Sequence, residues 1–294
     1  MEAETRPTAP EPVSRLKSFF ALIRKSKEAI VGLALVAVYF ATAIAVEVAS
    51  LLNVRITPYN PIQQNVGSAL SPPSFTHIFG TDLLGRDVFS RIVAATPNDM
   101  AISMVVVLVS LLIGISVGSV AGLRGGLLDE LLMRFTDVIF ALPALLIAIV
   151  IAVALGPSVV NMMIALTAVW WPPYARLARG EALRVAHQNY IEAARSSGMG
   201  LWKTMIKHVV PNISVTMLVY TTLDAGTVIL AYAGLSYLGL SVRPPFPDWG
   251  YMVSSFQDYL ISEPWLPLIP GLVIALVVVG FSFLGDGIRD ALEE

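Results

Sequence analysis

Six long apolar segments limit what this chain can fold into. A segment of about 20 mostly apolar residues is long enough to cross the hydrocarbon core of a bilayer as a helix. Hydrophobic residues make up 56% of the chain and charged residues only 14%, whereas soluble domains carry about a quarter charged residues. The sequence therefore predicts an all-α integral membrane protein with about six transmembrane helices, at residues 29–52, 101–123, 136–156, 158–178, 213–237 and 266–285.

The positions of lysine and arginine predict which loops lie in the cytoplasm, because cytoplasmic loops carry an excess of both. All 19 fall in the first 27 residues, in 124–134, in 176–207 or near the C-terminus, except Arg55, Arg86, Arg91 and Arg243. With an even number of spans, this distribution puts both termini in the cytoplasm and residues 53–96 outside. We expect a flexible cytoplasmic tail at 1–27 and a short one at 287–294. The first apolar run is too long for a signal-peptide core and should remain as an anchor.

The chain lacks the residue patterns of an enzyme. It contains no cysteine, and its three histidines, His77, His187 and His208, show no metal-ligand spacing. It has no phosphate-binding loop, since Leu240 stands where such a loop would need its lysine after Gly234 and Gly239. We therefore expect no catalytic residue and no metal site. If the chain pumps anything, a partner must supply the energy.

One polar segment on the expected cytoplasmic side is a candidate docking element. Glu192, Ala193 and Ala194 suit a helix, near 182–197, that lies close against a partner surface. Gly198 can adopt positive φ and end that helix in a sharp turn, and Pro211 can open the next helix. The alternative is a solvated connecting helix with no partner.

The spans contain small residues and prolines with structural meaning. Glycines four apart on one helix face let two backbones approach closely in lipid, and they occur at Gly114, Gly118 and Gly122. We favour packing within the bundle over a contact with another subunit. Pro143 and the pair Pro172-Pro173 should kink their spans.

Asp224, near the middle of the fifth span, is the acid with the clearest functional potential. A charge at mid-bilayer costs at least about 2.5–3.5 kcal/mol and should face the bundle interior or a water-filled path. Asp224 would then contact substrate or a coupling ion. The alternative is a hydrogen-bonded carboxyl that ties helices together. Glu47 and Asp99 also lie in or near spans, and Asp137 is expected to be an interfacial acid.

Two external stretches could bind a soluble partner, or could simply cover the external end of the helix bundle. Residues 71–91 contain acid–base pairs four residues apart, Asp82 with Arg86 and Asp87 with Arg91. Such pairs support a helical turn, so we expect a structured loop that leads to a short interfacial helix. Residues 241–251 are rich in proline and aromatic residues, which suit an interface.

Several runs in this order resemble the C-type permeases of the dipeptide, oligopeptide and nickel group of ABC importers. The candidate docking element resembles the EAA loop of such permeases, which inserts into a cleft on the ATP-hydrolysing subunit. The matching runs cover nearly everything from about residue 75 onward and lie at 77–91, 129–137, 171–181, 190–195, 235–240 and 244–250.

This resemblance implies a type I ABC importer permease fold in the plasma membrane of a prokaryote. It implies a homologous second permease, two ATP-binding subunits that hold ATP and Mg²⁺, an extracytoplasmic solute-binding protein, and no bound cofactor or nucleic acid. The permease domain would span 97–286, after a first helix and external segment at 28–96, with its coupling loop at about 181–211. The coupling residues would be Tyr190, Glu192, Ala193, Ala194, Gly198, His208 and Pro211.

The implied cargo is a di- or oligopeptide, with oligosaccharides or nickel as alternatives. Tyr232 stands where the family usually has a glutamate, so it and Asp224 are candidates to line the translocation path. A stand-alone secondary transporter driven through Asp224 would instead predict internal inverted repeats, and no clear repeat is present in the sequence.

Overall fold

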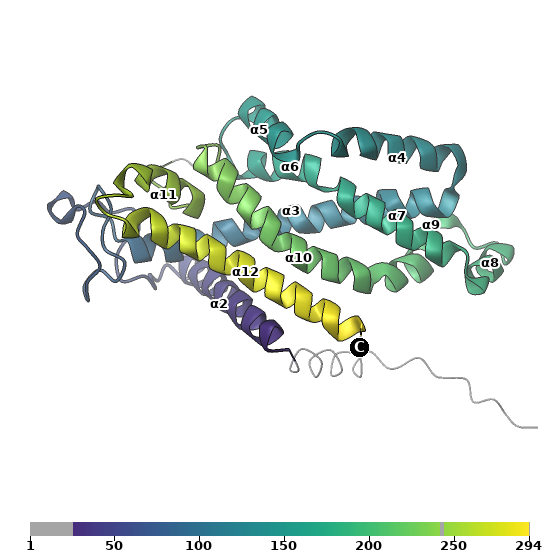
Figure 1. Cartoon of the computed structure of the whole chain (residues 1–294), viewed down its shortest axis with the longest axis horizontal. Coiled ribbons are helices and arrows are strands. Elements are labelled where there is room, and N and C mark those ends of the chain that lie inside the picture. Colours follow the sequence, from purple (N-terminus) through teal and green to yellow (C-terminus); the bar gives the residue numbers. More distant parts are fainter. Residues whose placement is uncertain (1–25, 242–243, 294) are drawn as a thin grey trace, which may run out of the picture.

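The computed structural model describes residues 26–241 and 244–293 (Figure 1), so the expected tail at 1–25 lies outside the described residues. The described chain is helical apart from turns and one isolated bridge between Thr81 and Asp87. This confirms the all-α prediction. The helices are α2 (Lys27–Leu51), α3 (Val88–Arg124), α4 (Gly126–Phe140), α5 (Ala144–Leu155), α6 (Val159–Trp170), α7 (Pro172–Ala186), α8 (Asn189–Ser196), α9 (Leu201–Thr204), α10 (Val210–Tyr237), α11 (Trp249–Phe256) and α12 (Trp265–Glu293), with short 3₁₀ turns at Val66–Ser68 and Gln257–Tyr259.

Four stretches of the described chain are long and apolar enough to cross a membrane as single helices: α2, α3, Leu201–Tyr237 and most of α12. The third and fourth predicted spans are each interrupted at the prolines that indicated a kink, and neither is one continuous helix. The third is broken into α4 and α5, which bend by 82° across three residues that include Pro143. Proline lacks the N–H that an unbroken helix needs there. The fourth is divided at Trp171 into the short apolar α6 and the polar α7.

Helix contacts place both ends of the described chain at one end of the bundle. Ala29 at the start of α2 packs against Gly287 and Ile288 near the end of α12. Along α10 and α12, Gly226 lies beside Val278 and Gly285 beside Leu223, so these two helices are antiparallel. The segment that precedes α10, including α8, therefore lies at the end where α12 finishes, and residues 52–87 and α11 lie at the other end (Figure 1).

The glycine face of α3 packs within the bundle, as predicted, against α7. A Cβ at Gly114 would lie 2.3 Å from the Cβ of Tyr174, and one at Gly118 would lie 2.2 Å from the carbonyl oxygen of Ala175. Only glycine leaves room for this approach. α7 in turn holds α4, through ion pairs that join Arg179 to Asp129 and Arg176 to Asp137, each at 2.6 Å.

The buried apolar residues form two main groups. The larger group lies between α3, α10, α11 and α12 and contains fully buried Met100, Tyr232 and Trp249. The second group joins the ends of α3 and α7 to α8 and to the start of the Leu201–Tyr237 helix. This second core is what fixes the position of α8.

Candidate functional site

The predicted turn at Gly198 is present. Gly198 has φ +80°, and the amide of Met199 donates to the carbonyl of Ala194 at 3.1 Å, which closes the end of α8. A Cβ at Gly198 would meet nothing within 4 Å, so the backbone angle alone calls for glycine here. The expected helix over 182–197 is instead two helices, because α7 ends at Ala186 and α8 starts at Asn189.

The short helix α8 has one anchored face and one accessible face. Ile191 is fully buried in the second core, beside Met205 and Val209. Glu192 and Ala193 are exposed, and the Tyr190 side chain is 44% exposed. Tyr190, Glu192 and Ala193, which were predicted to meet a partner, therefore lie on the accessible side of a helix that the buried Ile191 fixes to the bundle, and Ala194 is partly exposed.

Pro211 lies in the first turn of α10, as predicted, although the helical run that leads into α10 starts earlier. The helix begins at Leu201 and continues through a π-helical turn at Met205–Val209 into α10, with Pro211 near the start of α10. The His208 ring lies 5.9 Å from the ring of Tyr190. A small pocket of 290 Å³ opens here, lined by Arg184, Val185, Gln188, Tyr190 and Asn212.

Sequence reasoning missed two apolar side chains beside α8. Trp202 is 61% exposed and Ile206 is 65% exposed, and they lie four residues apart on one helix. Side chains at this spacing share a helix face. Together with Glu192 and Ala193 they form what we call the α8 surface, defined by Tyr190, Glu192, Ala193, Trp202 and Ile206. The signal that could have identified them was this second i, i+4 apolar pair, which lies one position after Leu201 and Met205 of the inward-facing row.

Asp224 joins α10 to α6 and α7. Its Oδ2 accepts a hydrogen bond from the Trp170 indole N–H at 2.8 Å and another from the Tyr174 hydroxyl at 2.7 Å. The side chain is half-buried. A tie between helices, one of the two roles expected for this acid, is therefore present, and its role in a path stays a prediction.

Tyr232 belongs to a buried polar cluster near the end of α10. Its hydroxyl donates to the Asp248 carboxylate, which also accepts hydrogen bonds from the hydroxyls of Ser236 and Ser241. Asp248 in addition accepts from the amide of Tyr251 at 3.0 Å and so caps α11. Sequence reasoning did not select Asp248, although an acid directly before a helix is a common N-cap. The predicted role of Tyr232 in a path stays a prediction.

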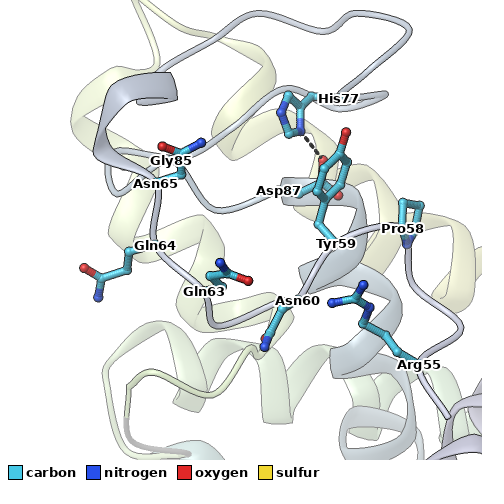
Figure 2. Close-up of a pocket in the computed structure, with 10 residues that line it drawn as sticks. All are labelled: Arg55, Pro58, Tyr59, Asn60, Gln63, Gln64, Asn65, His77, Gly85 and Asp87. Carbon is cyan, nitrogen blue, oxygen red and sulfur yellow. Dashed lines mark hydrogen bonds and ion pairs between the residues drawn. The ribbon is translucent and has the colours of Figure 1, made fainter.

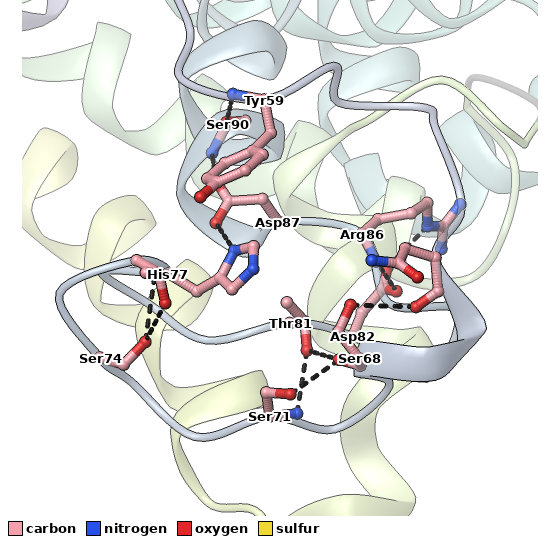
Figure 3. Close-up of polar contacts among 12 residues, drawn as sticks. Tyr59, Ser68, Ser71, Ser74, His77, Thr81, Asp82, Arg86, Asp87 and Ser90 are labelled. Atoms are coloured by element: carbon pink, nitrogen blue, oxygen red, sulfur yellow. Dashed lines mark hydrogen bonds and ion pairs between the residues drawn. The ribbon is translucent and has the colours of Figure 1, made fainter.

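The external segment is held by buried polar contacts rather than by a helix (Figure 3). Asp82 is fully buried, and its carboxylate accepts from the amides of Leu84 and Arg86 and from the Arg86 side chain at 2.7 Å. The expected pairing of Asp87 with Arg91 is wrong. Asp87 instead caps α3 through the amide of Ser90 and bonds to His77 Nδ1 at 2.9 Å.

No separate interfacial helix follows this loop, because α3 starts at Val88 and runs unbroken to Arg124. Arg91 in its first turns donates to the carbonyl of Pro61 at 2.8 Å and to that of Pro245 at 3.3 Å. It thereby joins the two external stretches that the sequence had singled out separately.

A polar cleft opens on this external segment (Figure 2). It has a volume of 370 Å³, and amide and guanidinium side chains line much of it. The Tyr59 ring lies 4.5 Å from the His77 ring along one wall. The residues that line it are Arg55, Pro58, Tyr59, Asn60, Gln63, Gln64, Asn65, His77, Gly85 and Asp87.

Comparison with known proteins identifies the class of protein that carries these features. Residues 114–294 match the family described as binding-protein-dependent transport system inner membrane component. The chain is 39% identical over 292 residues to the dipeptide transport system permease protein DppC of Escherichia coli strain K12, covering 97% of this chain and 95% of that protein.

Two further relatives agree with this result. The DppC protein of Alkalihalophilus pseudofirmus is 36% identical over 293 residues, covering 98% of this chain and 94% of its own length. The glutathione transport system permease protein GsiD of Shigella flexneri is 42% identical over 221 residues, covering 75% of this chain and 73% of its own length. This chain therefore belongs to the family of binding-protein-dependent transport system inner membrane components, as a multi-pass membrane permease.

Proposed function

We propose that this chain is a pore-forming subunit of an ATP-driven importer of di- and oligopeptides. The observation that carries the proposal is the similarity to dipeptide permeases over nearly the whole chain. In the proposed assembly it pairs with a homologous second permease and two ATP-binding subunits, and it receives its cargo from an extracytoplasmic binding protein.

The α8 surface suits the contact with an ATP-binding subunit. It combines an exposed carboxylate, Glu192, with the exposed apolar side chains of Trp202 and Ile206. Aromatic and apolar side chains buried at the centre of an interface contribute most of its binding energy. Ile191 fixes α8 to the ends of α3, α7 and α10. A displacement of α8 by a bound ATP-binding subunit would therefore also displace these long helices.

The external segment suits the contact with a binding protein. Its backbone is fixed by the buried Asp82 and Arg91, and its cleft exposes hydrogen-bonding side chains such as Arg55, Asn60 and Gln63. A rigid polar surface at the end opposite the α8 surface is where an extracytoplasmic partner would deliver cargo.

Reconstitution tests this function. The four cognate membrane and ATP-binding subunits are placed in proteoliposomes, with ATP inside and the loaded binding protein outside. We expect uptake of a labelled dipeptide only when both ATP and the binding protein are present. Uptake that persists without the ATP-binding subunits would instead favour a secondary transporter. A binding protein that retains only oligosaccharide or nickel, and delivers it, would favour those cargoes.

A further inference from the structure

A partly accessible polar stripe runs along α10 at the centre of a long apolar helix. Thr216, Tyr220, Asp224 and Thr227 follow one another at spacings of four, four and three residues, so they share a face. None of the four is fully buried. Lipid does not suit such a face, because a charged group in the bilayer normally faces protein or a water-filled cavity. Part of the stripe packs against α6 and α7, and the part left accessible suits a partner or an aqueous path.

A groove lies beside the N-terminal half of this stripe, at Thr216 and Tyr220. It has a volume of 460 Å³ and is lined by Leu177 of α7, by Arg289 of α12 and by residues of α10 that include Thr216, Tyr220 and Leu223. Asp224 follows one turn after Tyr220 on the same helix. The carboxylate thus lies directly beyond the groove along the helix axis.

The two oxygens of Asp224 differ in their surroundings. Oδ2 receives both hydrogen bonds, from Trp170 and Tyr174. Oδ1 accepts none within the described chain, and it is not an enclosed atom. No arginine, lysine or histidine among the described residues forms an ion pair with this carboxylate. Oδ2 is therefore held in place by two donors, and this also fixes the direction of Oδ1, which can still accept a hydrogen bond from a bound cation.

Three aromatic side chains lie at or near this carboxylate. Trp170 and Tyr174 donate their hydrogen bonds to Oδ2, and the Tyr220 ring packs edge-to-face on the Tyr174 ring at 5.0 Å. A carboxylate with one oxygen fixed and the other unoccupied suits an organic ammonium group, whose N–H donors form charge-assisted hydrogen bonds to such an oxygen. Asp224 is the only charged residue of α10, and Arg289 of α12 lines the neighbouring groove.

We propose that Asp224, together with Trp170, Tyr174 and Tyr220, forms a binding site for the primary ammonium group of the transported molecule. The inference rests on the proposed function, since it places this site in the translocation path. A peptide presents such a group at its amino terminus. The site would hold that group by the free Oδ1 while the rest of the peptide occupies the neighbouring groove.

Cysteine chemistry tests the site directly, because the native chain contains no cysteine. Thr227→Cys puts a single thiol one turn from Asp224 on the stripe. In the full complex, its reaction rates with cationic aminoethyl, neutral methyl and anionic sulfonatoethyl methanethiosulfonate are compared. We expect the ratio of the cationic to the anionic rate to be about tenfold higher with Asp224 than with Asp224→Asn. The matched control, Glu130→Gln, removes an exposed carboxylate of α4 and should leave the ratio unchanged.

Peptides identify the source of the ammonium group. Alanyl-alanine should slow the reaction of the thiol, and N-acetyl-alanyl-alanine, which lacks the ammonium group, should not. In Asp224→Asn neither peptide should protect. This pattern separates a peptide amino terminus from a cation supplied by the second permease, which would neutralise Asp224 in every state.

Two results would overturn the inference. In one, the neutral reagent fails to reach Thr227→Cys in any nucleotide state, which places the stripe outside the aqueous path. In the other, the reagents react but Asp224→Asn leaves their ratio unchanged, which shows that the carboxylate attracts no free cation. Dipeptide uptake by the same preparations is scored separately. Normal uptake with either result refutes only this site, whereas no uptake in the parent complex refutes the proposed function.

Discussion

At the scale of single residues, Gly198 and Gly200 make a natural pair for testing how the α8 surface works. Both lie between α8 and α9, and a Cβ on either one would meet nothing within 4 Å. They differ in backbone conformation, since Gly198 has φ +80° and Gly200 has φ −69°. Any effect of a side chain at Gly198 but not at Gly200 must come from the turn and not from a clash.

We predict that Gly198→Val uncouples ATP hydrolysis from transport, and that Gly200→Val does not. Residues other than glycine resist the left-handed conformation by about 1–2 kcal/mol, so valine should shift the turn and tilt the α8 surface. The long helices do not depend on this turn, and the protein should still insert and pair. Substrate-stimulated ATP hydrolysis and subunit retention are measured in parallel. Full coupling in Gly198→Val would place the docking surface elsewhere, most plausibly on 124–134.

At the scale of helices, the close approach of α3 and α7 depends on the glycines of α3. A Cβ at Gly118 would lie 2.2 Å from the Ala175 carbonyl oxygen, whereas a Cβ at Gly180, on α7 itself, would meet nothing within 4 Å. We predict that Gly118→Leu separates the two helices and sharply lowers the yield and thermal stability of the protein. Gly180→Ala should be neutral or stabilising by about 0.5–1 kcal/mol, because glycine weakens a helix interior.

Thermal unfolding in detergent and gel filtration measure this difference. If Gly118→Leu kept the thermal stability of the parent, the glycine face would not be a tight contact in the membrane. The α8 surface should be lost together with the contact, because α7 leads directly into α8 and its last turns belong to the same core as Ile191.

The same scale explains which elements the sequence could predict. Hydrophobic length predicted α2, α3, α10 and α12 well, because a long apolar run in lipid has few alternatives to a helix. It could not find the 82° bend between α4 and α5. Pro143 indicated a kink, but the size of a bend depends on what the two halves pack against. The ion pairs of α4 with Arg176 and Arg179 are contacts of that kind.

The sequence predicted those features of the candidate site that depend on neighbouring residues. It did not predict contacts between residues that are far apart in the chain. Gly198 followed from the turn that its neighbours require. The link from Asp224 to Trp170 and Tyr174 spans at least 50 residues and leaves no local trace. The wrong pairing of Asp87 with Arg91 has the same origin. Spacing of four residues places two side chains on one face only inside a helix, and Asp87 lies one residue before α3 begins. The Asp82–Arg86 pair forms within the loop instead.

At the scale of the whole molecule, the two candidate partner surfaces lie at opposite ends of the bundle (Figure 1). The lysine and arginine distribution predicts that the α8 surface lies in the cytoplasm and residues 53–87 outside. The antiparallel packing of α10 with α12 puts the α8 end and the C-terminal end together, which agrees with cytoplasmic termini. The molecule thus has the arrangement that a transporter with a partner on each side requires.

We predict that two single cysteines report these opposite sides. Phe75 in the external segment is fully exposed, and Trp202 is 61% exposed on the α8 surface. Because neither side chain is in a core, Phe75→Cys and Trp202→Cys should both fold in the cysteine-free chain. In intact spheroplasts, an impermeant maleimide should label Phe75→Cys at once and Trp202→Cys only after the membrane is permeabilised.

In the complete complex, the ATP-binding subunits should slow labelling of Trp202→Cys even after permeabilisation, and the loaded binding protein should slow labelling of Phe75→Cys. Labelling of Trp202→Cys but not of Phe75→Cys in intact spheroplasts would show that the predicted topology is inverted. Labelling of both cysteines in intact spheroplasts would contradict a bundle with partners at its two ends.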